Sequence, residues 1–237
     1  SDLELSSCEH NGRMAVRAVF GLGHVCDDSE LHPLEAEPRM NRKNWLITGC
    51  SSGFGRAIAE AALAAGQHVI ATARDVRSIA DLERAGSCEV MALDITDAAN
   101  IHEVIAAAGT LDVIVNNAGY GYLDSVEEAD EAAVRRMFEV NFFGLAAVTR
   151  AVLPGMRARR RGWIVNISSM VGRVALPGSA YYSASKFAVE GLSMGLRGEV
   201  EPLGIGVTSV QPGPIRTDFS GRSLVTGERW ADDYEAT

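Results

Sequence analysis

A phenol, an amine and a hydroxyl stand close together in the segment SSMVGRVALPGSAYYSASK, residues 168–186. If the residues from about 179 onward are helical, Tyr182 and Lys186 lie one turn apart on the same helix face. A free tyrosine has a pKa near 10 and exchanges protons poorly at neutral pH. An ammonium group about 4 Å away, at an effective dielectric constant of about 20, contributes roughly 4 kcal/mol, or about three pKa units. This spacing predicts a tyrosine that exchanges a proton near neutral pH.

The same spacing also fits an ordinary amphipathic helix with a core tyrosine and a solvated lysine, so other features must distinguish the two. Tyr181 competes with Tyr182, but the residue four positions after it is Ser185, which carries no positive charge. Two serines, Ser168 and Ser169, end an expected strand, and strand alternation sends their side chains to opposite faces. One of the two hydroxyls is therefore expected to project into a crevice beside Tyr182.

Composition limits the classes of function. The chain has 237 residues, of which 47% are hydrophobic, and a net charge of −9. This favours one sizeable core and argues against nucleic acid or an acidic membrane as a partner. The four cysteines have no metal-site or redox spacing and are too sparse for a disulfide scaffold, and no apolar run approaches the roughly 18 residues of a membrane span. We expect a cytoplasmic protein without a metal.

Residues 1–39 differ from the rest of the chain. They show no clear periodicity and carry eight acidic residues against three basic ones. Met40 stands just before the first strong apolar run, which suggests that it is the natural start and that 1–39 is an upstream or disordered extension. We therefore expect one domain over 40–237.

From residue 44 onward, short runs rich in β-branched residues alternate with helical patterns. Strands are expected at 44–48, 68–73, 89–93, 111–116, 162–168 and 205–211. Helices are expected at 55–65, 78–85, 98–107, 125–159 and 180–203, with Pro154 kinking or ending the fourth. This alternation predicts an α/β fold with a doubly wound parallel sheet, whose ligand crevice lies beyond the carboxyl ends of the strands.

A glycine-rich loop, Thr48-Gly49-Cys50-Ser51-Ser52-Gly53-Phe54-Gly55, joins the first expected strand to an alanine-rich helix. Glycines permit a tight turn and a close approach of the backbone to a pyrophosphate, and the helix N-terminus offers free N–H groups. An ordinary glycine-rich turn is the alternative, although the strand before and the helix after it favour a dinucleotide site.

With this loop, the Asn116-Asn117-Ala118-Gly119 run and the Tyr-x-x-x-Lys pair, the chain resembles the short-chain dehydrogenase/reductases over roughly residues 42–220. The text TGCSSGFG and YSASKFAVEG is most similar to the hydroxysteroid and retinol dehydrogenase type and to bacterial members like it. Family members continue through a further helix and strand after this point, so the resemblance implies that the C-terminal helix and strand are missing here.

The resemblance implies a Rossmann-like fold and a bound nicotinamide dinucleotide. The residues that match the family's cofactor contacts are Thr48, Gly49, Ser51, Ser52, Gly53, Phe54, Gly55, Arg74, Asp94, Ile95, Asn116, Ala118, Gly119, Tyr182, Lys186, Pro212, Gly213, Ile215 and Thr217. Asp94 is also placed to cap the next helix, and the Pro212-Gly213-Pro214 run is also a plausible proline-rich loop exit.

The end of the second expected strand bears on the choice of cofactor. Ala73 stands where NAD-preferring relatives carry an acid, and Arg74 follows it. A guanidinium forms forked, charge-assisted hydrogen bonds with a 2′-phosphate. The sequence therefore predicts NADP(H), with NAD(H) as the second choice. The alternative is a solvated arginine beside Asp75.

The resemblance implies that Asn141, Ser169, Tyr182 and Lys186 form the catalytic group. Ser169, thirteen residues before Tyr182, would orient a substrate oxygen. Asn141 would support a proton relay, although an ordinary helical asparagine remains an alternative. Lys186 would lower the pKa of Tyr182 and hold the nicotinamide ribose. The implied reaction interconverts a carbonyl and a secondary alcohol by hydride transfer, with Tyr182 handling the proton.

Three further expectations follow. The substrate is a small molecule, and Phe219, Leu224 and Trp230 would make its pocket moderately apolar. The chain is expected to form a homodimer or homotetramer when full length. The alternative function is a catalytically silent nucleotide-binding scaffold or sensor of the same fold.

Overall fold

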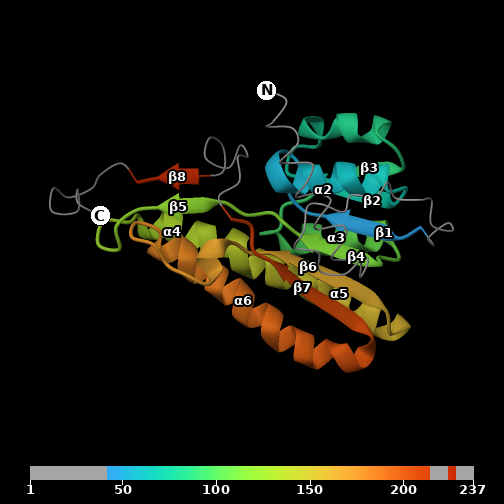
Figure 1. The fold of residues 1–237 in the computed structure, drawn as a ribbon. Helices are drawn as coiled ribbons and strands as arrows, with labels where there is room; N and C mark the ends of the chain where they lie inside the picture. Colours follow the sequence, from blue (N-terminus) through green and yellow to red (C-terminus); the bar gives the residue numbers. More distant parts are fainter. Residues whose placement is uncertain (1–41, 214–223, 228–237) are drawn as a thin grey trace, which may run out of the picture.

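The structure is a computed structural model that describes residues 42–213 and 224–227. Its main feature is a parallel sheet of six strands in the order β3-β2-β1-β4-β6-β7 (Figure 1). The six are β1 (Asn44–Ile47), β2 (His68–Ala73), β3 (Cys88–Ala92), β4 (Val113–Asn116), β6 (Gly162–Ile167) and β7 (Ile205–Val210). This order confirms the predicted doubly wound fold, whose switch point lies between β1 and β4. The extension predicted at 1–39 lies outside the described residues and stays a prediction.

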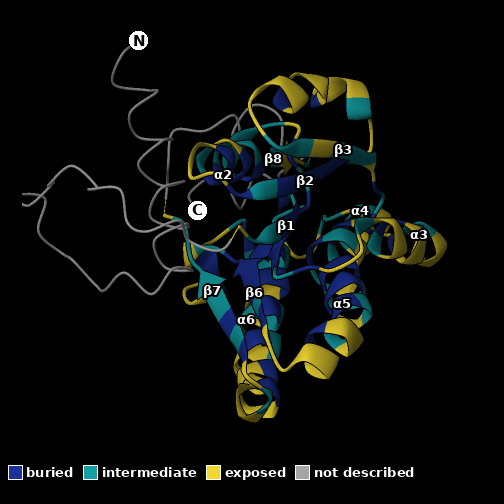
Figure 2. Ribbon diagram, turned by 90° about the vertical axis from the view of Figure 1, so that its right-hand side faces the viewer, coloured by how far each residue is buried: buried dark blue, intermediate teal, exposed yellow. Residues whose placement is uncertain are grey.

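Helices cover both faces of the sheet because successive strand residues point to opposite sides. On one face, Trp45 and Ile47 pack with Ile58 and Leu63 of α2 (Gly53–Ala64). On the other face, Leu46 packs in a cluster that includes residues of α3 (Ala98–Ala108), α5 (Leu145–Arg159) and α6 (Ala180–Val200). The central strands are accordingly buried, whereas the outer helix faces are exposed (Figure 2).

Two predicted helices differ from the structure. The stretch expected at 78–85 forms two short 3-10 helices, η1 (Val76–Ser78) and η2 (Ala80–Arg84). The helix expected at 125–159 starts at Glu131, because the Asp130 side chain accepts a hydrogen bond from the Ala132 amide and caps α4 (Glu131–Phe138) there. It continues through a π-helix, η3 (Glu139–Gly144), into α5.

Pro154 was expected to kink or end this helix, and it does not end it, because α5 continues to Arg159. A proline removes one backbone hydrogen bond from a helix interior. Here Val152 and Met156, on either side of it, are buried against the sheet. Their burial favours continuation of the helix, since each fully buried apolar side chain is worth roughly 1.5–3 kcal/mol.

The sequence patterns did not predict a second, two-stranded sheet. It pairs β5 (Gly121–Leu123) with β8 (Leu224–Thr226) in parallel, with Tyr122 opposite Val225. Figure 1 shows this pair beside α4, away from the main sheet. Two further short helices occur in the described ranges, η4 (Met170–Gly172) and η5 (Glu201–Leu203).

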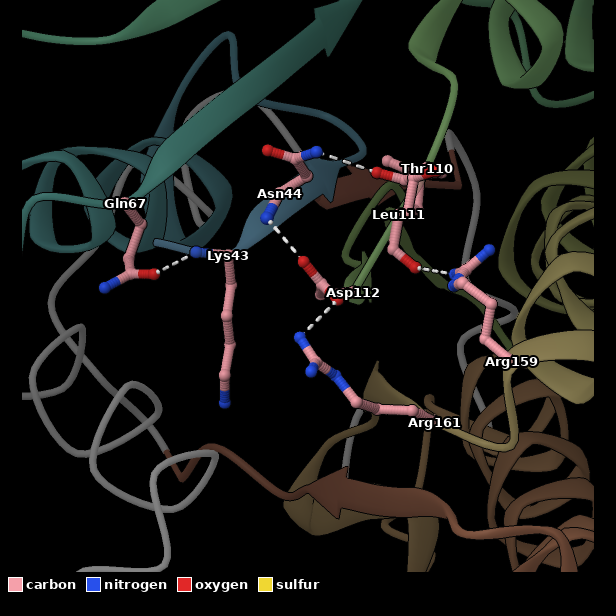
Figure 3. A network of polar contacts seen from close by, with 8 residues as sticks. All are labelled: Lys43, Asn44, Gln67, Thr110, Leu111, Asp112, Arg159 and Arg161. Carbon is pink, nitrogen blue, oxygen red and sulfur yellow. Dashed lines mark hydrogen bonds and ion pairs between the residues drawn. The ribbon is translucent and has the colours of Figure 1, made fainter. Parts of the chain in front are cut away.

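A polar network ties the amino ends of the central strands together (Figure 3). The Asp112 carboxylate accepts a hydrogen bond from the Asn44 amide at 3.1 Å and pairs with Arg161 at 3.0 Å. Arg159 donates to the Leu111 carbonyl at 2.6 Å. These contacts fix the starts of β1, β4 and β6 relative to one another, so their carboxyl ends are held in register at the opposite edge.

The helical stretch Glu131–Arg159 is long and apolar enough to cross a membrane by length and composition, with a window of mean hydropathy 1.2. This differs from the expectation that no apolar run approaches the length of a membrane span. In the fold, Val148, Val152 and Met156 of this stretch are buried in the cluster against the sheet. The apolar side chains of this stretch thus contribute to the hydrophobic core.

Candidate active site

The glycine loop is fastened to the end of β4 by two side chains. The Thr48 hydroxyl accepts hydrogen bonds from the backbone amides of Asn117 and Ala118 at 2.9 and 3.0 Å. The Asn117 side-chain amide donates to the carbonyls of Thr48 and Gly49 at 2.9 and 3.0 Å. The two strands at the switch point are therefore joined at their carboxyl ends, where the crevice was predicted. Thr48 was predicted, but the role of Asn117 was missed, although it lies in the Asn-Asn-Ala-Gly run.

Each glycine of the loop has its own geometric reason. Gly49 and Gly53 have φ angles of +72° and +58°, the left-handed region that favours glycine. A Cβ on Gly55 would meet the Asn117 amide nitrogen and would lie 2.5 Å from the Gly49 carbonyl oxygen. A Cβ on Gly53 would meet nothing within 4 Å, so this side of the loop is open.

We expect Gly55→Ala to destabilise the protein by about 1–3 kcal/mol, because the added methyl must displace backbone as well as the Asn117 side chain. Cofactor affinity should fall at least tenfold as the loop shifts. Urea unfolding and titration with NADPH measure the two effects. Gly195→Ala in α6 is the matched control, since nothing lies within 4 Å of its Cβ position. Equal behaviour of the two variants would contradict this account of the loop.

The start of α2 has the properties of an anion site. Its N-cap, Ser52, makes no side-chain capping bond, and the first turn holds no acidic residue. The N–H groups of the first turn therefore keep their positive potential toward the open side of the loop. Ser51 is exposed at the same place. The residues present thus fit the pyrophosphate of a dinucleotide.

Arg74 follows β2 as an exposed residue and makes no hydrogen bond or ion pair among the described residues. Asp75 pairs with Arg77 at 2.9 Å, so Arg74 is an exposed arginine beside an acid that is already paired, which also agrees with the alternative of a solvated arginine. Hydrogen bonds from Arg77 hold the pKa of Asp75 below its ordinary value. The charge of Arg74 is therefore available for a ligand.

Asp94 lies at the next strand end. Its carboxylate accepts hydrogen bonds from the Thr96 hydroxyl at 2.7 Å and the Thr96 amide at 2.9 Å. These bonds, helped by the charge of Arg74, hold the pKa of Asp94 below its ordinary value. The alternative role of Asp94 as a helix cap is wrong, because Asp97 caps α3. Asp94 is thus an ionised carboxylate with Arg74 nearby.

Two predicted cofactor residues direct their side chains into the core. The Asn116 amide nitrogen donates to Thr149 and Asn166, both at 2.9 Å, and the residue is 3% exposed. Ile95 is buried, and a Cβ on Gly144 would lie 2.8 Å from its side chain. Strand alternation explains Asn116, since its neighbour Asn117 faces the loop instead. The side chain of Asn116 therefore links β4 to β6 and α5 and does not reach the crevice.

Tyr182 and Ser169 come together as predicted. Tyr182 is 7% exposed and hydrogen-bonds to Ser169, whose hydroxyl also accepts from the Val171 amide at 3.3 Å. Tyr181 is directed elsewhere and donates to the Val126 carbonyl at 3.2 Å. Of the two tyrosines, Tyr182 is thus the one that shares a site with the predicted serine.

The predicted direction of the Tyr182 pKa shift is wrong. Burial raises the pKa of Tyr182 above its ordinary value of 10.0, and the hydrogen bond with Ser169 opposes this only in part. The Lys186 ammonium lies 6.0 Å from the centre of the phenol ring. Desolvation of the phenolate is the larger cause, and it outweighs the stabilisation that the Ser169 hydrogen bond provides. The phenol holds its proton at neutral pH.

Lys186 is buried, with 5% of its surface exposed, and its ammonium donates to the Ile167 carbonyl at 3.0 Å. Burial lowers the pKa of Lys186 from 10.5 to about 8, while the carboxylate of Glu190 acts in the opposite direction. A Cβ on Gly119 would lie 3.5 Å from the ammonium nitrogen. The ammonium therefore lies beside the backbone that follows β4, where the Asn141 side-chain oxygen, at 3.0 Å from the same Cβ position, is the tighter neighbour.

Asn141 is held in the π-helix at 1% exposure. Its side chain accepts from the Tyr120 amide at 2.9 Å and donates to the Tyr120 carbonyl at 2.8 Å and to the Ser185 hydroxyl at 3.1 Å. The asparagine thus fastens the segment after Gly119 to helix α6, close to Lys186. Single-turn π-helices occur often at functional sites. The relay role of Asn141 stays a prediction.

The last predicted group is described in part. Pro212 accepts a hydrogen bond from the Met170 amide at 2.9 Å, which brings the end of β7 to the residue after Ser169. Gly213 is exposed beside it. Ile215, Thr217, Phe219 and Trp230 lie outside the described residues. Two hollows of the described part are lined by none of the predicted catalytic residues, one by Phe138, Phe143 and Tyr181 and the other by Arg173, Phe187 and Glu190.

Comparisons with known proteins agree with this geometry. The chain matches the short chain dehydrogenase family over residues 43–225. It therefore belongs to that family, and it is an oxidoreductase with a Rossmann-like fold.

Named relatives span a range of substrates. The 3-ketodihydrosphingosine reductase of Bacteroides thetaiotaomicron is 40% identical over 198 residues, which are 80% of this chain and 72% of that protein. Human Retinol dehydrogenase 8 is 37% identical over 189 residues, which are 76% of this chain and 61% of that protein. The chain thus spans roughly two thirds of the length of these relatives.

Solved structures give the same result. A short-chain dehydrogenase from Streptomyces avermitilis superposes with a TM-score of 0.76 at 47% identity, over 80% of this chain and 72% of the other. The structure of ElxO with NADP bound gives a TM-score of 0.72 at 32% identity, over 75% and 76% of the two chains.

Proposed function

We propose that this protein is an NADP(H)-dependent reductase of carbonyl compounds, which also oxidises the corresponding secondary alcohols. The observation that carries the proposal is the meeting of Tyr182, Ser169 and Lys186 at the carboxyl end of β6, next to the open glycine loop. When bound, the nicotinamide supplies or accepts the hydride.

The protein's own groups handle the oxygen. The Tyr182 phenol, which keeps its proton at neutral pH, donates that proton to the substrate oxygen during reduction. The Ser169 hydroxyl, already hydrogen-bonded to Tyr182, orients the same oxygen. Lys186 places a positive charge beneath the site and offers its remaining N–H groups to the cofactor ribose.

Arg74 supports NADP(H) over NAD(H), since its guanidinium has no competing partner and Asp75 is already paired. The bound NADP in ElxO is consistent with this choice. Ser51, exposed at the facing loop, would provide a hydroxyl for the same 2′-phosphate.

We expect Arg74→Asp to lower the ratio of kcat/KM with NADPH to kcat/KM with NADH roughly 100-fold. The forked hydrogen bonds between the guanidinium and the 2′-phosphate would be replaced by repulsion between a carboxylate and that phosphate. Initial rates with both cofactors measure the ratio. Arg84→Asp, at an exposed position in η2, makes the same change in net charge and serves as the control. An unchanged ratio in Arg74→Asp would refute the assignment of the 2′-phosphate site.

The function is tested by following NADPH absorbance with a panel of steroids, retinoids, quinones, 3-oxoacyl esters and simple ketones. Consumption of NADPH with at least one carbonyl compound is the expected result. Tight NADPH binding without turnover of any member would instead favour a catalytically silent nucleotide-binding scaffold. We further propose a cytoplasmic location. We also propose assembly as a homodimer or homotetramer, because Phe143 and Phe187 are large apolar side chains exposed on helices.

A further inference from the structure

A carboxylate lies on the same helix as the catalytic pair, one turn beyond the lysine. Tyr182, Lys186 and Glu190 follow one another on α6 at intervals of four residues, so Lys186 is a neighbour of both of the others. The proton transfer proposed for the first two makes no use of the third. Glu190 is half-buried, and charged side chains are seldom buried without partners. Its partners therefore indicate its role.

Two strand ends hold the Glu190 side chain. The Ser209 hydroxyl of β7 donates a hydrogen bond to the Glu190 carboxylate at 2.6 Å. A Cβ on Gly172 would lie 2.7 Å from the Ser168 hydroxyl oxygen and 3.3 Å from the Glu190 γ carbon, so these two side chains meet over the glycine. Ser168 follows β6 and directly precedes the catalytic Ser169. The carboxylate therefore connects α6 to the strand ends beside the catalytic serine.

These surroundings keep the carboxylate ionised. Burial raises the pKa of Glu190, but its hydrogen-bonding partners and the charge of Arg173 lower it, and the net pKa lies below its ordinary value. The hydrogen-bonding partners are Ser168, Ser209 and Gln211. Arg173 is exposed and lines the same hollow as Glu190, so the carboxylate lies close to solvent as well. Glu190 is thus negatively charged at neutral pH.

The negative charge of Glu190 acts on the buried ammonium of Lys186. Burial lowers the pKa of Lys186 to about 8, and the Glu190 carboxylate opposes this shift. The ammonium itself donates to the Ile167 carbonyl at 3.0 Å, so the carboxylate acts on it from a distance. The other described groups that face the ammonium are neutral: the Tyr182 phenol, which keeps its proton, and the side-chain amide of Asn141. Glu190 thus favours the charged form of Lys186.

We propose that Glu190 is a positioning residue of the reductase, whose carboxylate keeps Lys186 protonated beneath Tyr182. Along α6 it lies beyond Lys186 as seen from Tyr182, and it acts through Lys186 instead of contacting the reacting atoms. The inference rests on the proposed reductase function, because that function needs a positive charge at Lys186. Burial alone disfavours this charge, and a nearby carboxylate restores part of it.

The first test measures kcat against pH with the full chain, saturating NADPH and a ketone that the protein reduces. Activity should fall above about pH 8 as Lys186 loses its proton. Glu190→Gln removes the charge but keeps the shape, so this alkaline limb should move to lower pH by about half a unit. An opposite charge in direct contact shifts a pKa by about one to three units, and a more distant one by less. At pH 6.5, where Lys186 is charged in both proteins, kcat should agree within about threefold.

Two control variants separate the charge of Glu190 from its structural contacts. Glu190→Asp keeps the charge and shortens the side chain, so its alkaline limb should lie closer to that of the unmodified protein than to that of Glu190→Gln. Glu199→Gln neutralises an exposed acid on the same helix and should leave the limb unchanged. A purely structural role predicts the opposite order, because glutamine can still accept the hydrogen bond from Ser209 whereas aspartate is too short.

A second measurement does not depend on turnover. Urea unfolding at pH 7 is compared for the unmodified protein, Glu190→Gln, Lys186→Met and the double variant. Glu190→Gln should destabilise the unmodified protein more than it destabilises the Lys186→Met background, because only the former holds the ammonium. The expected difference is about 0.7 kcal/mol, which is half a pKa unit converted to free energy.

An alkaline limb that stays in place in Glu190→Gln would overturn the inference and leave the reductase function standing. Equal destabilisation by Glu190→Gln in the two backgrounds would overturn it as well, since the two charges would then be independent. If no ketone consumes NADPH, the proposed function itself fails, and the unfolding comparison still decides whether Glu190 acts on Lys186.

Discussion

Replacing Tyr182 by phenylalanine should lower kcat for carbonyl reduction by about 10³-fold and leave NADPH affinity within about threefold. The change removes the proton donor, and proton transfer by a positioned side chain contributes typically 10²–10⁴-fold. The ring itself stays buried beside Val171 and Tyr122, so unfolding free energy should change by no more than about 1 kcal/mol. Stopped-flow or steady-state rates with saturating NADPH measure the loss.

Tyr181→Phe is the control for this variant, because it removes the same group one residue away. Its hydroxyl contacts the Val126 carbonyl and not the catalytic group. Activity within about threefold of the unmodified protein is expected. If Tyr182→Phe keeps its turnover, or if Tyr181→Phe loses it, the assignment of the proton donor is wrong.

Replacing Lys186 by methionine should have opposite effects on activity and on stability. Activity should fall at least 100-fold, because the positive charge beneath the site and a ribose contact are both lost. Stability at pH 7 should rise. A pKa lowered from 10.5 to about 8 means that burying the charged Lys186 destabilises the folded state by on the order of 3 kcal/mol. Methionine removes this cost but also loses the hydrogen bond to the Ile167 carbonyl, which is worth about 1 kcal/mol.

The pH dependence distinguishes this cause from a simple gain in packing. Between about pH 8 and 10.5 the unfolded chain holds the Lys186 proton and the folded chain has released it. The unfolded state then binds more protons, so this group's contribution raises stability as pH increases through that window. Urea unfolding at pH 7 and pH 9.5 should show the advantage of Lys186→Met shrinking by about 2 kcal/mol. An advantage that is absent at pH 7, or that does not change with pH, would contradict the burial cost.

The fold and most of the site could be predicted from the sequence because local patterns determine them. Alternating β-branched runs and helical runs predicted a doubly wound parallel sheet, and the structure adds its strand order, in which β1 and β4 meet at the switch point. The glycine loop was predictable because Gly49 and Gly53 need positive φ angles that other residues rarely adopt. Arg74 was identified from its place after β2, but only the structure shows that the neighbouring Asp75 forms its ion pair with Arg77.

Long-range contacts explain what the sequence did not predict. The pairing of β5 with β8 joins three-residue strands about 100 positions apart, and so short a pattern carries no periodicity. The Tyr182 pKa depends on how deeply the phenol is buried and on its hydrogen bond with Ser169, which the spacing of two residues on a helix does not give. Asn116 and Asn117 are both asparagines at the end of β4, so residue type does not distinguish them. Because successive residues point to opposite faces, the Asn117 side chain binds the glycine loop and the Asn116 side chain lies in the core.

The central claim is that hydride moves between nicotinamide and a carbonyl carbon while Tyr182 supplies the proton. It is tested most directly with NADPH deuterated at the transferring C4 position and a ketone that the protein turns over, followed by mass spectrometry of the product. The account predicts an alcohol with one deuterium on the former carbonyl carbon and a hydroxyl proton from solvent, formed about 10³-fold more slowly by Tyr182→Phe. Consumption of NADPH without deuterium in the alcohol would contradict it.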